Sequence, residues 1–495
     1  MNTIDWHARA AALVIDGRAL INGRRVDAVD GGTFECLSPI DGRRLASVAR
    51  CKAADVDRAV AAARAAFADR RWAGMSPGDR KRTLIRFADL VMANREELAL
   101  LETLDMGKPI SASMATDVPA TANTLRWYGE AIDKVYDEIA PTNDRTLALI
   151  TREPMGVVAA IVPWNYPLLM ASWKIAPALV AGNSVILKPS EKSPLTALRL
   201  GDLALEAGIP VGVFNVVPGF GPEAGSPLAL HMDVDCIAFT GSTAVGKKIQ
   251  VMAGESNLKR AWCELGGKSP NIVFADCPDL DRAVAAAAGS IFYNQGESCN
   301  APSRLLVERS IRDEFVEKLK QYSPRHMPGD PLDPNTTMGA LVDQGQMDNV
   351  LKYIEAGKSQ GATLCCGGER VRTETGGFYV SPTIFDGVTN EMIIASEEIF
   401  GPVLSIITFD SQEEAIQIAN DTSYGLAAAV WTRDISRAHL VSRALRAGTV
   451  HVNCYDEDDI TVPFGGYKQS GNGRDKSLHA LEKYTELKTT WISLT

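Results

Sequence analysis

The chain has 495 residues, 46% of them hydrophobic and 23% charged, and carries a net charge of −10 at pH 7. This length exceeds what one hydrophobic core serves and predicts roughly two to four domains of ~100–200 residues each. The negative charge, with no stripe of lysine or arginine to offset it, argues against a nucleic-acid partner, and no apolar run approaches the ~20 residues that cross a bilayer.

The first part of the chain is predicted to contain short strands followed by long helices. Strand-like runs lie at residues 13–15, 19–21 and 46–48. Beyond them, alanine-rich stretches repeat apolar positions at helical spacing, and Pro77 sits where a helix is expected to start. The predicted helices cover 54–68, 79–104 and 114–136.

From residue 155 to 264, strands and helices alternate strictly. The predicted strands are 157–162, 184–187, 213–217, 236–239 and 259–263. The predicted helices are 168–180, 194–206, a short one before 236, and 244–252. Continuous apolar strands alternating with helices predict a parallel sheet covered on both faces. This is a doubly wound, Rossmann-like nucleotide-binding architecture, in which ligands sit at the carboxyl ends of the strands.

A second alternating series, from about 265 to 465, predicts a separate α/β domain. Its strands are expected near 271–274, 304–308, 403–408, 427–431 and 449–453. Its helices are expected near 279–292, 310–322, 343–360, 411–420 and 434–446. The tail from 482 alternates like a strand, and with residues 138–153 it is expected to form a projecting sheet. Such an edge left unpaired is an aggregation hazard, so we expect it to pair between subunits.

Cysteine and histidine usage gives no sign of a metal site. The nine cysteines are odd in number and show no C-x-x-C spacing, and the six histidines form no i, i+4 pair. The N-terminus lacks the basic and apolar regions of a signal peptide, so we expect a cytoplasmic protein whose cysteines are free thiols.

One cysteine stands apart from the others. Cys299 lies in a loop of small and polar residues, 294–304, between an apolar helical run at 283–293 and an apolar strand-like run at 305–307. A cysteine kept only for packing would more often sit inside such a run, because a free cysteine behaves as a small buried hydrophobe. The loop therefore favours a reactive thiol over a bystander.

Two turns of the doubly wound region are candidates for binding a nucleotide. Lys188 and Glu191 follow the second strand, where an acidic group bonds an adenine ribose hydroxyl in such folds. A carboxylate there repels a 2′-phosphate, so it favours NAD over NADP. The small residues of 239–246, between a strand and a helix, let backbone N–H groups approach a pyrophosphate. A solvated polar turn at Lys188 and a plain helix cap at 239–246, whose glycine spacing departs from G-x-G-x-x-G, are the alternatives.

Two further strand ends carry polar groups suited to catalysis. Glu264 ends an apolar strand and is followed by Gly266 and Gly267, so its carboxylate can swing and serve as a general base. Asn165 lies just past another strand end, where its amide can donate to a developing oxyanion. A domain-boundary linker and a capping asparagine are the alternatives.

These parts suit one sequence of steps. A thiol attacks an aldehyde to give a thiohemiacetal, hydride passes to a nicotinamide, and water activated by a carboxylate cleaves the thioester. No histidine lies near Cys299 in sequence, so a Cys–His hydrolase is not indicated. A Cys–Glu–Lys hydrolase such as an amidase remains an alternative of another class, as does a structural protein descended from an enzyme.

Together the motifs resemble the aldehyde dehydrogenase superfamily over roughly residues 20–490. The seven segments that carry the resemblance are Pro-Trp-Asn at 163–165, Lys-Pro-Ser-Glu at 188–191, Phe-Thr-Gly-Ser at 239–242, Glu-Leu-Gly-Gly-Lys at 264–268, the thiol loop at 296–304, Glu-Ile-Phe-Gly-Pro at 398–402, and Pro-Phe-Gly-Gly at 463–466. The resemblance implies an α/β fold with cofactor, catalytic and bridging domains. These would be 1–137 with 154–264, 265–465, and 138–153 with 482–495.

The resemblance also implies the roles of individual residues. It makes Cys299 the nucleophile, Glu264 the general base and Asn165 the oxyanion donor, with Lys174 on a proton route. The implied NAD contacts are Trp164, Lys188, Glu191, Gly241, Ser242, Glu398 and Phe400. The implied aldehyde tunnel is lined by Tyr166, Met170, Trp173, Tyr293 and Phe464. NADP is expected as a weaker cofactor, and the family assembles as dimers or tetramers, of which we expect the homotetramer.

Two positions depart from the family pattern. Pro302 stands where many members have a smaller residue after the thiol, which is expected to stiffen the loop without abolishing activity. Asp475 replaces a common glutamate on the proton route past Lys174, which is expected to slow deacylation without changing the reaction.

The substrate prediction rests on an acidic loop. The chain most resembles bacterial enzymes of putrescine and polyamine breakdown, which oxidise γ-glutamyl-γ-aminobutyraldehyde or 4-guanidinobutyraldehyde, above all at 101–110 and 461–491. The loop before Phe464 reads Asp-Glu-Asp-Asp at 456–459, and its carboxylates, Asp458 among them, would attract a cationic substrate tail. An exposed, solvated loop is the alternative. A broad or aromatic aldehyde oxidiser, for example of indole-3-acetaldehyde, is the second substrate hypothesis because the implied tunnel is rich in rings.

Overall fold

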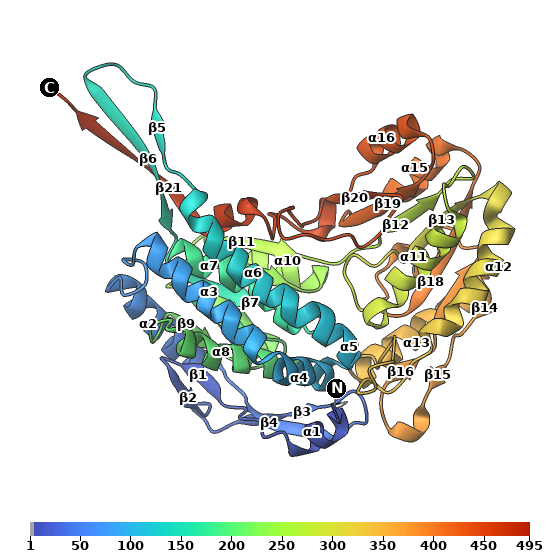
Figure 1. The fold of residues 1–495 in the computed structure, drawn as a ribbon, viewed down its shortest axis with the longest axis horizontal. Helices are drawn as coiled ribbons and strands as arrows, with labels where there is room; N and C mark the ends of the chain where they lie inside the picture. Colours follow the sequence, from blue (N-terminus) through green and yellow to red (C-terminus); the bar gives the residue numbers. More distant parts are fainter. Residues whose placement is uncertain (1–3) are drawn as a thin grey trace.

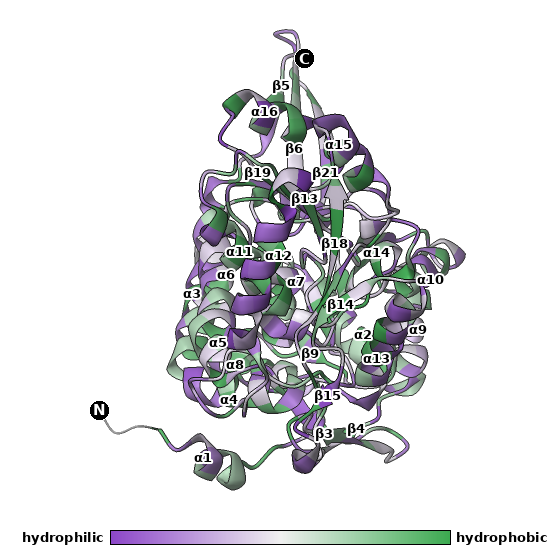
Figure 2. Cartoon of the chain, turned by 90° about the vertical axis from the view of Figure 1, so that its right-hand side faces the viewer, coloured by the Kyte–Doolittle hydropathy of each residue, from purple (hydrophilic) through white to green (hydrophobic). Residues whose placement is uncertain are grey.

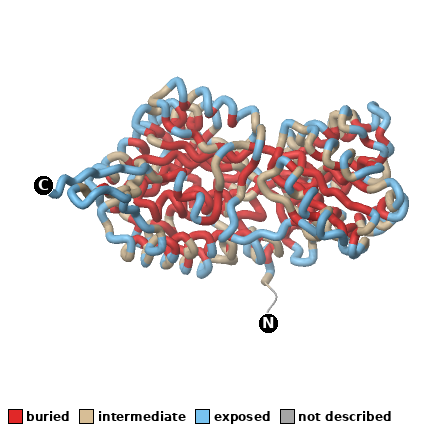
Figure 3. The backbone as a smooth tube through the Cα atoms, turned by 90° about the horizontal axis from the view of Figure 1, so that it is seen from above, coloured by how far each residue is buried: buried red, intermediate tan, exposed pale blue. Residues whose placement is uncertain are grey.

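The computed structural model describes residues 4–495, which form an α/β structure with two large sheets and a narrow sheet that projects from one end (Figure 1). Figure 3 shows the buried residues gathered in two bodies, with the projecting sheet exposed. No helix within this range is both long and apolar enough to span a membrane.

The first large sheet has the strand order β11-β10-β7-β8-β9-β1-β2. Its five parallel strands are β7 (Val157–Ile161), β8 (Ser184–Lys188), β9 (Phe214–Val216), β10 (Cys236–Thr240) and β11 (Arg260–Glu264). Two short strands add antiparallel at one edge, β1 (Ala19–Ile21) and β2 (Arg24–Val26). The predicted parallel sheet is therefore present, extended by an antiparallel edge.

Helices cover both faces of this sheet. Along β7, Val158 and Ala160 pack into one core, while Val157 and Ala159 pack into the other. Burial on both faces explains why this strand has no polar positions. The covering helices are α2 (Ala53–Ala68), α3 (Pro77–Ala93), α4 (Arg95–Met106), α6 (Val118–Ala131), α7 (Pro167–Ala181), α8 (Leu195–Ala207), α9 (Ser226–Leu230) and α10 (Thr243–Glu255).

The second large sheet has the order β14-β17-β18-β13-β12-β19-β20, with β14 antiparallel and the others parallel. Its strands are β12 (Pro270–Val273), β13 (Arg304–Glu308), β14 (Thr363–Cys366), β17 (Thr383–Asp386), β18 (Val403–Phe409), β19 (Ala427–Trp431) and β20 (Thr449–Val452). Its helices are α11 (Leu280–Phe292), α12 (Arg312–Tyr322), α13 (Gln344–Ser359), α14 (Ile393–Ser396), α15 (Gln412–Asn420) and α16 (Ile435–Ala444). Figure 2 shows α12 as a largely hydrophilic helix.

The projecting sheet joins three segments that are far apart in the sequence. β21 (Thr485–Ser493) pairs antiparallel along the full length of β6 (Thr146–Pro154), which also pairs with β5 (Glu138–Ala140). Large apolar side chains on it are exposed, including Leu487 and Trp491. The pairing of the tail with the segment near 138–153 therefore occurs as predicted.

The N-terminal third departs most from the prediction. Residues 13–15 form no strand and instead follow α1 (Trp6–Ala12), with Val14 fully exposed and without a strand partner. The predicted helix 79–104 is two helices, because Asn94 leaves helical geometry and its side chain caps the carbonyl of Leu90. The predicted helix 114–136 begins with α5 (Ile110–Ala112) and a wide turn at Ser113–Asp117 before α6.

The predicted strand 46–48 is present as β4 (Arg44–Ala49), which pairs with β3 (Thr33–Leu37) in a hairpin. The strand β3 escaped prediction because its run is short. So did the pair β15 (Arg370–Val371) and β16 (Tyr379–Val380) and the strands β14 and β17.

Candidate active site

The carboxyl ends of the first sheet gather four predicted residues at one edge. Register pairs Ile161 with Lys188 and Thr240 with Glu264, so β7, β8, β10 and β11 end side by side. Asn165 follows β7, and Ser242 follows β10. Ligands of doubly wound sheets bind at this edge.

Two cavities open here, and they meet at the predicted nucleophile. One has a volume of about 250 Å³ and is lined by residues of the strand ends, and the other has a volume of about 420 Å³ and is lined partly by residues of β19 and β20 in the second large sheet. Met170 and Cys299 line both. A group bound in either cavity therefore reaches the same thiol.

The thiol loop is held by a strained turn. After α11 the backbone is left-handed at Asn294, Gln295 and Gly296, and a Cβ on Gly296 would lie 2.1 Å from the carbonyl oxygen of Gly401. Two buried side chains of the loop bond to the backbone of a distant segment and so hold the turn. Oε1 of Gln295 accepts the N–H of Gly339, and Oε1 of Glu297 accepts the N–H of Val342, both at 3.0 Å. Such strain persists only where the surroundings over-determine it, and it clusters at active sites.

Burial, together with the nearby carboxylates of Glu264 and Glu398, raises the pKa of the Cys299 thiol to about 12. Hydrogen bonds from the backbone at Cys299 and Asn300 act in the opposite direction but do not outweigh them. The thiol is therefore protonated at neutral pH, so attack on a substrate requires a base that takes its proton.

Glu264 is the candidate for the base that takes this proton. Both of its carboxyl oxygens are buried and have no hydrogen-bond partner among residues 4–495. Burial raises its pKa well above the usual range, the charge of Asp475 adds to this, and Lys174 and Lys483 act against it. Its carboxyl group rests against Gly465, where a Cβ would come within 2.6 Å of Oε1, and it lines neither cavity. An unpartnered buried carboxyl group beside glycines is free to turn toward Cys299.

Asp475 lies at the centre of a buried ion cluster behind Glu264. Its two carboxylate oxygens pair with the ammonium groups of Lys174, on α7, and of Lys483. Burial raises the pKa of Asp475, but these two ammonium groups outweigh burial and hold it below the ordinary value. The predicted catalytic Lys174 is therefore part of a fixed charge cluster and contacts neither cavity.

The Asn165 amide is oriented by the thiol loop. Its Nδ2 donates to the carbonyl of Glu297 at 2.9 Å, and Nδ2 of Asn294 donates to the carbonyl of Asn165 at 3.0 Å. An amide nitrogen carries two hydrogens, so one N–H of Asn165 is left for a ligand. Asn165 lines the smaller cavity together with Cys299.

The smaller cavity contains most of the predicted cofactor contacts. Trp164, Gly241, Ser242, Glu398 and Phe400 all line it. Oε1 of Glu398 accepts the N–H of Gly267 at 2.9 Å, and burial raises the pKa of this carboxyl group to about 7. The Phe400 ring packs edge-on against Trp164, with 5.1 Å between centroids.

The same cavity has two side chains that sequence reasoning missed. Gln346 and Asn349 both project from α13, and Nε2 of Gln346 donates to the carbonyl of Phe400 at 2.6 Å. No local signal marks them, because α13 lies about forty residues from the nearest motif and reaches the cavity only through the fold.

The residues around the smaller cavity fit a dinucleotide such as NAD. Ser242 caps the N-terminus of α10, and the preceding hydroxyl of Thr240 is buried without a partner within the described part of the chain. Gly266 has no room for a side chain, since a Cβ would lie 2.1 Å from Glu398. An open helix N-terminus and close backbone approach suit a pyrophosphate.

Lys188 and Glu191 lie at the end of β8, outside this cavity. Nζ of Lys188 donates to the carbonyl of Pro189 at 2.8 Å and is 4.0 Å from the Glu191 carboxylate, and burial lowers its pKa to about 8. Their place beside β7 at the sheet edge suits the distal end of a dinucleotide.

All six predicted substrate contacts line the larger cavity. They are Tyr166, Met170, Trp173, Tyr293, Asp458 and Phe464. Trp173 and Phe464 pack with their ring centroids 5.2 Å apart, and the hydroxyl of Tyr166 donates to Oγ of Ser298 at 3.4 Å. The acidic loop contributes Asp456, Glu457 and Asp458 to the lining, while the Asp459 carboxylate accepts from Thr461 in its own turn. Lys476, His451 and Asn300 also line the cavity and were not predicted.

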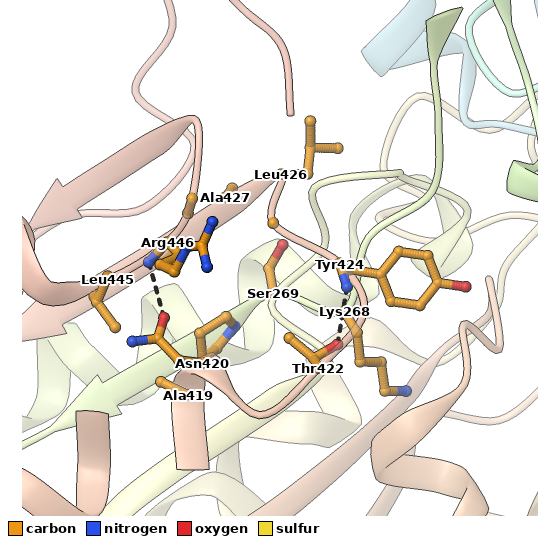
Figure 4. Close-up of a pocket in the computed structure, with 14 residues that line it drawn as sticks. Lys268, Ser269, Ala419, Asn420, Thr422, Tyr424, Leu426, Ala427, Leu445 and Arg446 are labelled. Atoms are coloured by element: carbon orange, nitrogen blue, oxygen red, sulfur yellow. Dashed lines mark hydrogen bonds between the residues drawn. The ribbon is translucent and has the colours of Figure 1, made fainter. Parts of the chain in front are cut away.

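A third cavity, behind the glycine turn that follows Glu264, is too small to bind a substrate. It measures about 10 Å³, room for about one water. Figure 4 shows the Lys268 side chain extending away from the hydroxyl of Ser269, and among the residues the structure describes its ammonium nitrogen has no hydrogen-bond partner. Burial lowers the pKa of Lys268 to about 7, so its charge is easily lost.

Known proteins match the chain over nearly its full length. Residues 26–490 match the Aldehyde dehydrogenase family. The NADP/NAD-dependent aldehyde dehydrogenase PuuC of Escherichia coli is 58% identical over 489 residues, which are 99% of this chain and 98% of that protein. Aminoacetaldehyde dehydrogenase of Pseudomonas aeruginosa is 49% identical, with the same coverage.

Solved structures agree closely with this fold. The crystal structure of γ-glutamyl-γ-aminobutyraldehyde dehydrogenase from Burkholderia cenocepacia is 64% identical, covers 99% of each chain and superposes with a TM-score of 0.98. Indole-3-acetaldehyde dehydrogenase in complex with NAD+ is 63% identical, with the same coverage and TM-score. The thiol, carboxyl and amide groups at the candidate site agree with the family match and with these relatives. The chain therefore belongs to the aldehyde dehydrogenase family.

Proposed function

We propose that this enzyme oxidises an aldehyde to its carboxylic acid at Cys299, with NAD as the cofactor. One observation carries the proposal: the cofactor-side and substrate-side cavities meet at this thiol. NAD would supply the hydride acceptor, and Glu398 and Phe400 would hold its nicotinamide ribose. The assignments of Lys188 and Glu191 to the adenine ribose, and of Ser242 to the pyrophosphate, are part of the proposal.

In the first half-reaction the thiol adds to the aldehyde carbonyl. Because the pKa of the thiol is raised, its proton must leave as the sulfur–carbon bond forms, and the Glu264 carboxylate takes it directly or through water. The carbonyl oxygen becomes an oxyanion that accepts hydrogen bonds from Nδ2 of Asn165 and the backbone N–H of Cys299. The aldehyde hydrogen then leaves as hydride, which converts the thiohemiacetal to a thioester.

In the second half-reaction water cleaves the thioester. Glu264 takes a proton from the water as its oxygen adds to the acyl carbon, Asn165 again stabilises the oxyanion, and the sulfur leaves and regains a proton. The Lys174–Asp475–Lys483 cluster stabilises the ionised form of Glu264, because the net charge of the cluster is positive. Pro302 and Asp475 are expected to modulate these rates.

The test is an aldehyde panel assayed with both cofactors. Absorbance of the reduced cofactor is expected to rise with aldehydes, as NADH with NAD and more slowly as NADPH with NADP. Failure to bind NAD in a calorimetric titration would instead support the Cys–Glu–Lys hydrolase hypothesis.

For the substrate we propose an aminoaldehyde of the kind met in polyamine breakdown, such as γ-glutamyl-γ-aminobutyraldehyde or 4-guanidinobutyraldehyde. The names of the Burkholderia and Pseudomonas relatives and the carboxylates at the cavity mouth support it. Equal efficiency with hexanal and with the charged aldehydes would contradict it.

An aromatic aldehyde is the second candidate. The rings of Tyr166, Trp173, Tyr293 and Phe464 favour it, and so does the indole-3-acetaldehyde relative. Indole-3-acetaldehyde in the same panel decides between the two.

The remaining assignments concern assembly and location. We propose the NAD-binding, catalytic and bridging domains with the boundaries given above, and a homotetramer or dimer that pairs through β21, whose Leu487 and Trp491 side chains are exposed. Sedimentation of the intact protein checks the assembly. The cytoplasmic location also stays a prediction.

A further inference from the structure

A buried lysine in the aldehyde cavity has no part in the chemistry described so far. Lys476 lines the cavity, its side chain is only 2% exposed, and its ammonium nitrogen lies 5.5 Å from the centre of the Trp173 ring. It comes from the segment after the bridge between Phe464 and Asp475, not from the acidic loop.

The backbone on either side holds Lys476 in place. Asp475 is fixed by its two ion pairs. Ser477 donates its N–H to the carbonyl of Ile460 at 2.8 Å and accepts the hydroxyl of Tyr128 at 3.0 Å. Lys476 and Ser477 both have left-handed backbones, with φ of 62° and 51°. The ammonium group is therefore presented to the cavity from a rigid position.

The charges around this ammonium group are mixed. It pairs with the carboxylate of Asp458, whose side chain is 56% exposed and can move. Glu457 lines the same region, and the carboxylate of Asp456 accepts a hydrogen bond from the amide of Asn300 at 3.1 Å. The cavity mouth thus offers one fixed cation surrounded by carboxylates, rather than the uniformly negative surface that the acidic loop predicts on its own.

A purely packing role would not need this charge. A buried ammonium group costs desolvation energy, and an unbranched apolar side chain of similar length would cover Trp173 as well. Its partner Asp458 is more than half exposed to solvent, so an incoming carboxylate can take its place. Asp458 and Glu457 would then lie beside the bound carboxylate of the ligand. They could accept hydrogen bonds from an ammonium group next to that carboxylate.

We propose that Lys476 binds the carboxylate of an aldehyde whose far end is an α-amino-acid group, while Asp458 and Glu457 bind the ammonium on the same carbon. This deepens the proposed function and rests on it, because it names the tail that the aldehyde cavity selects. It makes Lys476 a specificity residue.

The test pairs one variant with one change in the substrate. γ-Glutamyl-γ-aminobutyraldehyde is compared with its analogue in which the α-carboxylate is a carboxamide, using the wild type and Lys476→Met. The wild type is expected to lose about tenfold in kcat/KM with the carboxamide, whereas Lys476→Met loses less than about twofold, a coupling typical of two directly interacting charges. Lys320→Met, at an exposed lysine of α12 that pairs with Glu317, is the matched control and should keep the wild-type ratio.

The alternatives give distinct results. If Lys476 only anchors the acidic loop, Lys476→Met lowers kcat/KM for both substrates by the same factor, and the proposal is wrong. Equal use of both substrates by the wild type overturns it as well. Hexanal separates this from the proposed function: a wild type that oxidises no aldehyde at all refutes the enzyme assignment, whereas oxidation without discrimination refutes only the role of Lys476.

Discussion

The two cavities that meet at Cys299 are built in different ways. The cofactor-side cavity is lined mainly by backbone turns at strand ends, with glycines where a side chain would collide, as at Gly241 and Gly266. The aldehyde cavity is lined by side chains from the wide turn before α6, from α7 and α11, and from the loops after β20, and it contains a buried ammonium group among carboxylates.

This difference separates what is shared from what is specific. A dinucleotide presents the same phosphates and ribose to every enzyme that uses it, so backbone N–H groups suffice. Aldehydes differ in their tails, so the second cavity must discriminate with side-chain shape and charge. Substitution of Cys299 should therefore stop the reaction with every aldehyde. Substitutions in either cavity should alter the use of only the ligand that occupies that cavity.

The largest expected effect comes from substituting Cys299, where the two cavities meet. Cys299→Ser replaces the sulfur with a weaker nucleophile, so kcat should fall on the order of 10⁴-fold for every aldehyde. NAD affinity, measured by calorimetry, should stay within about threefold of the wild type. A variant that kept more than a tenth of the activity would show that the two cavities do not serve this thiol.

Glu264→Gln should separate the two half-reactions. The variant cannot activate water, so steady-state kcat should fall about 10²–10³-fold. Stopped-flow absorbance should still show a first turnover of about one equivalent of NADH per active site, formed more slowly than in the wild type because Glu264 also takes the thiol proton. The loss of this first-turnover amplitude would mean that thiol activation, rather than water activation, limits the variant.

The same group predicts the pH profile. Burial raises the pKa of Glu264, so the fraction of this group that is ionised and can act as a base increases at pH values above the usual carboxyl range. The raised pKa of Cys299 works in the same direction. The rate should therefore rise with pH through neutrality in the wild type. In Glu264→Gln the carboxylate limb of the deacylation profile should disappear.

The ion cluster behind Glu264 should matter for stability as well as rate. Asp475→Asn leaves the buried ammonium groups of Lys174 and Lys483 facing each other without a counterion, which should cost about 3–5 kcal/mol of unfolding free energy. Chemical denaturation measures this loss. Asp475→Glu keeps the charge, so it should retain most of the stability, and equal destabilisation by both variants would show that side-chain volume, not charge, is decisive.

The smallest expected effect is on the cofactor side. Glu191→Ser removes a carboxylate that would repel a 2′-phosphate, so the ratio of kcat/KM for NADP to that for NAD should rise about tenfold. Aldehyde preference should not change. An unaltered cofactor ratio would place the adenine ribose elsewhere along the sheet edge.

The sequence predicted the parts of this fold that have strong periodicity. The parallel strands and their helices were found because they are buried on both faces and read as continuous apolar runs. The strand β3, the break at Asn94 and the short strands β14 and β17 were not, because short or half-exposed segments are decided by tertiary partners rather than by their own pattern.

The candidate site divides in the same way. Cys299, Glu264 and Asn165 were predictable because each stands in a loop or at a strand end whose residue types are unusual for packing. Gln346 and Lys476 were not, because their cavity partners, Phe400 and Asp458, are 54 and 18 residues away in the chain and are brought to them only by the fold. The charge of the acidic loop was visible in sequence, but its pairing with Lys476 was not.

The most direct test of the central claim is the covalent intermediate itself. Glu264→Gln, mixed with NAD and an aldehyde and analysed by intact-mass and peptide mass spectrometry, should gain the mass of the aldehyde less two hydrogens, on the peptide that contains Cys299. NADH formation without such an adduct, or with the adduct on any other residue, would contradict the assignment of Cys299 as the nucleophile where the two cavities meet.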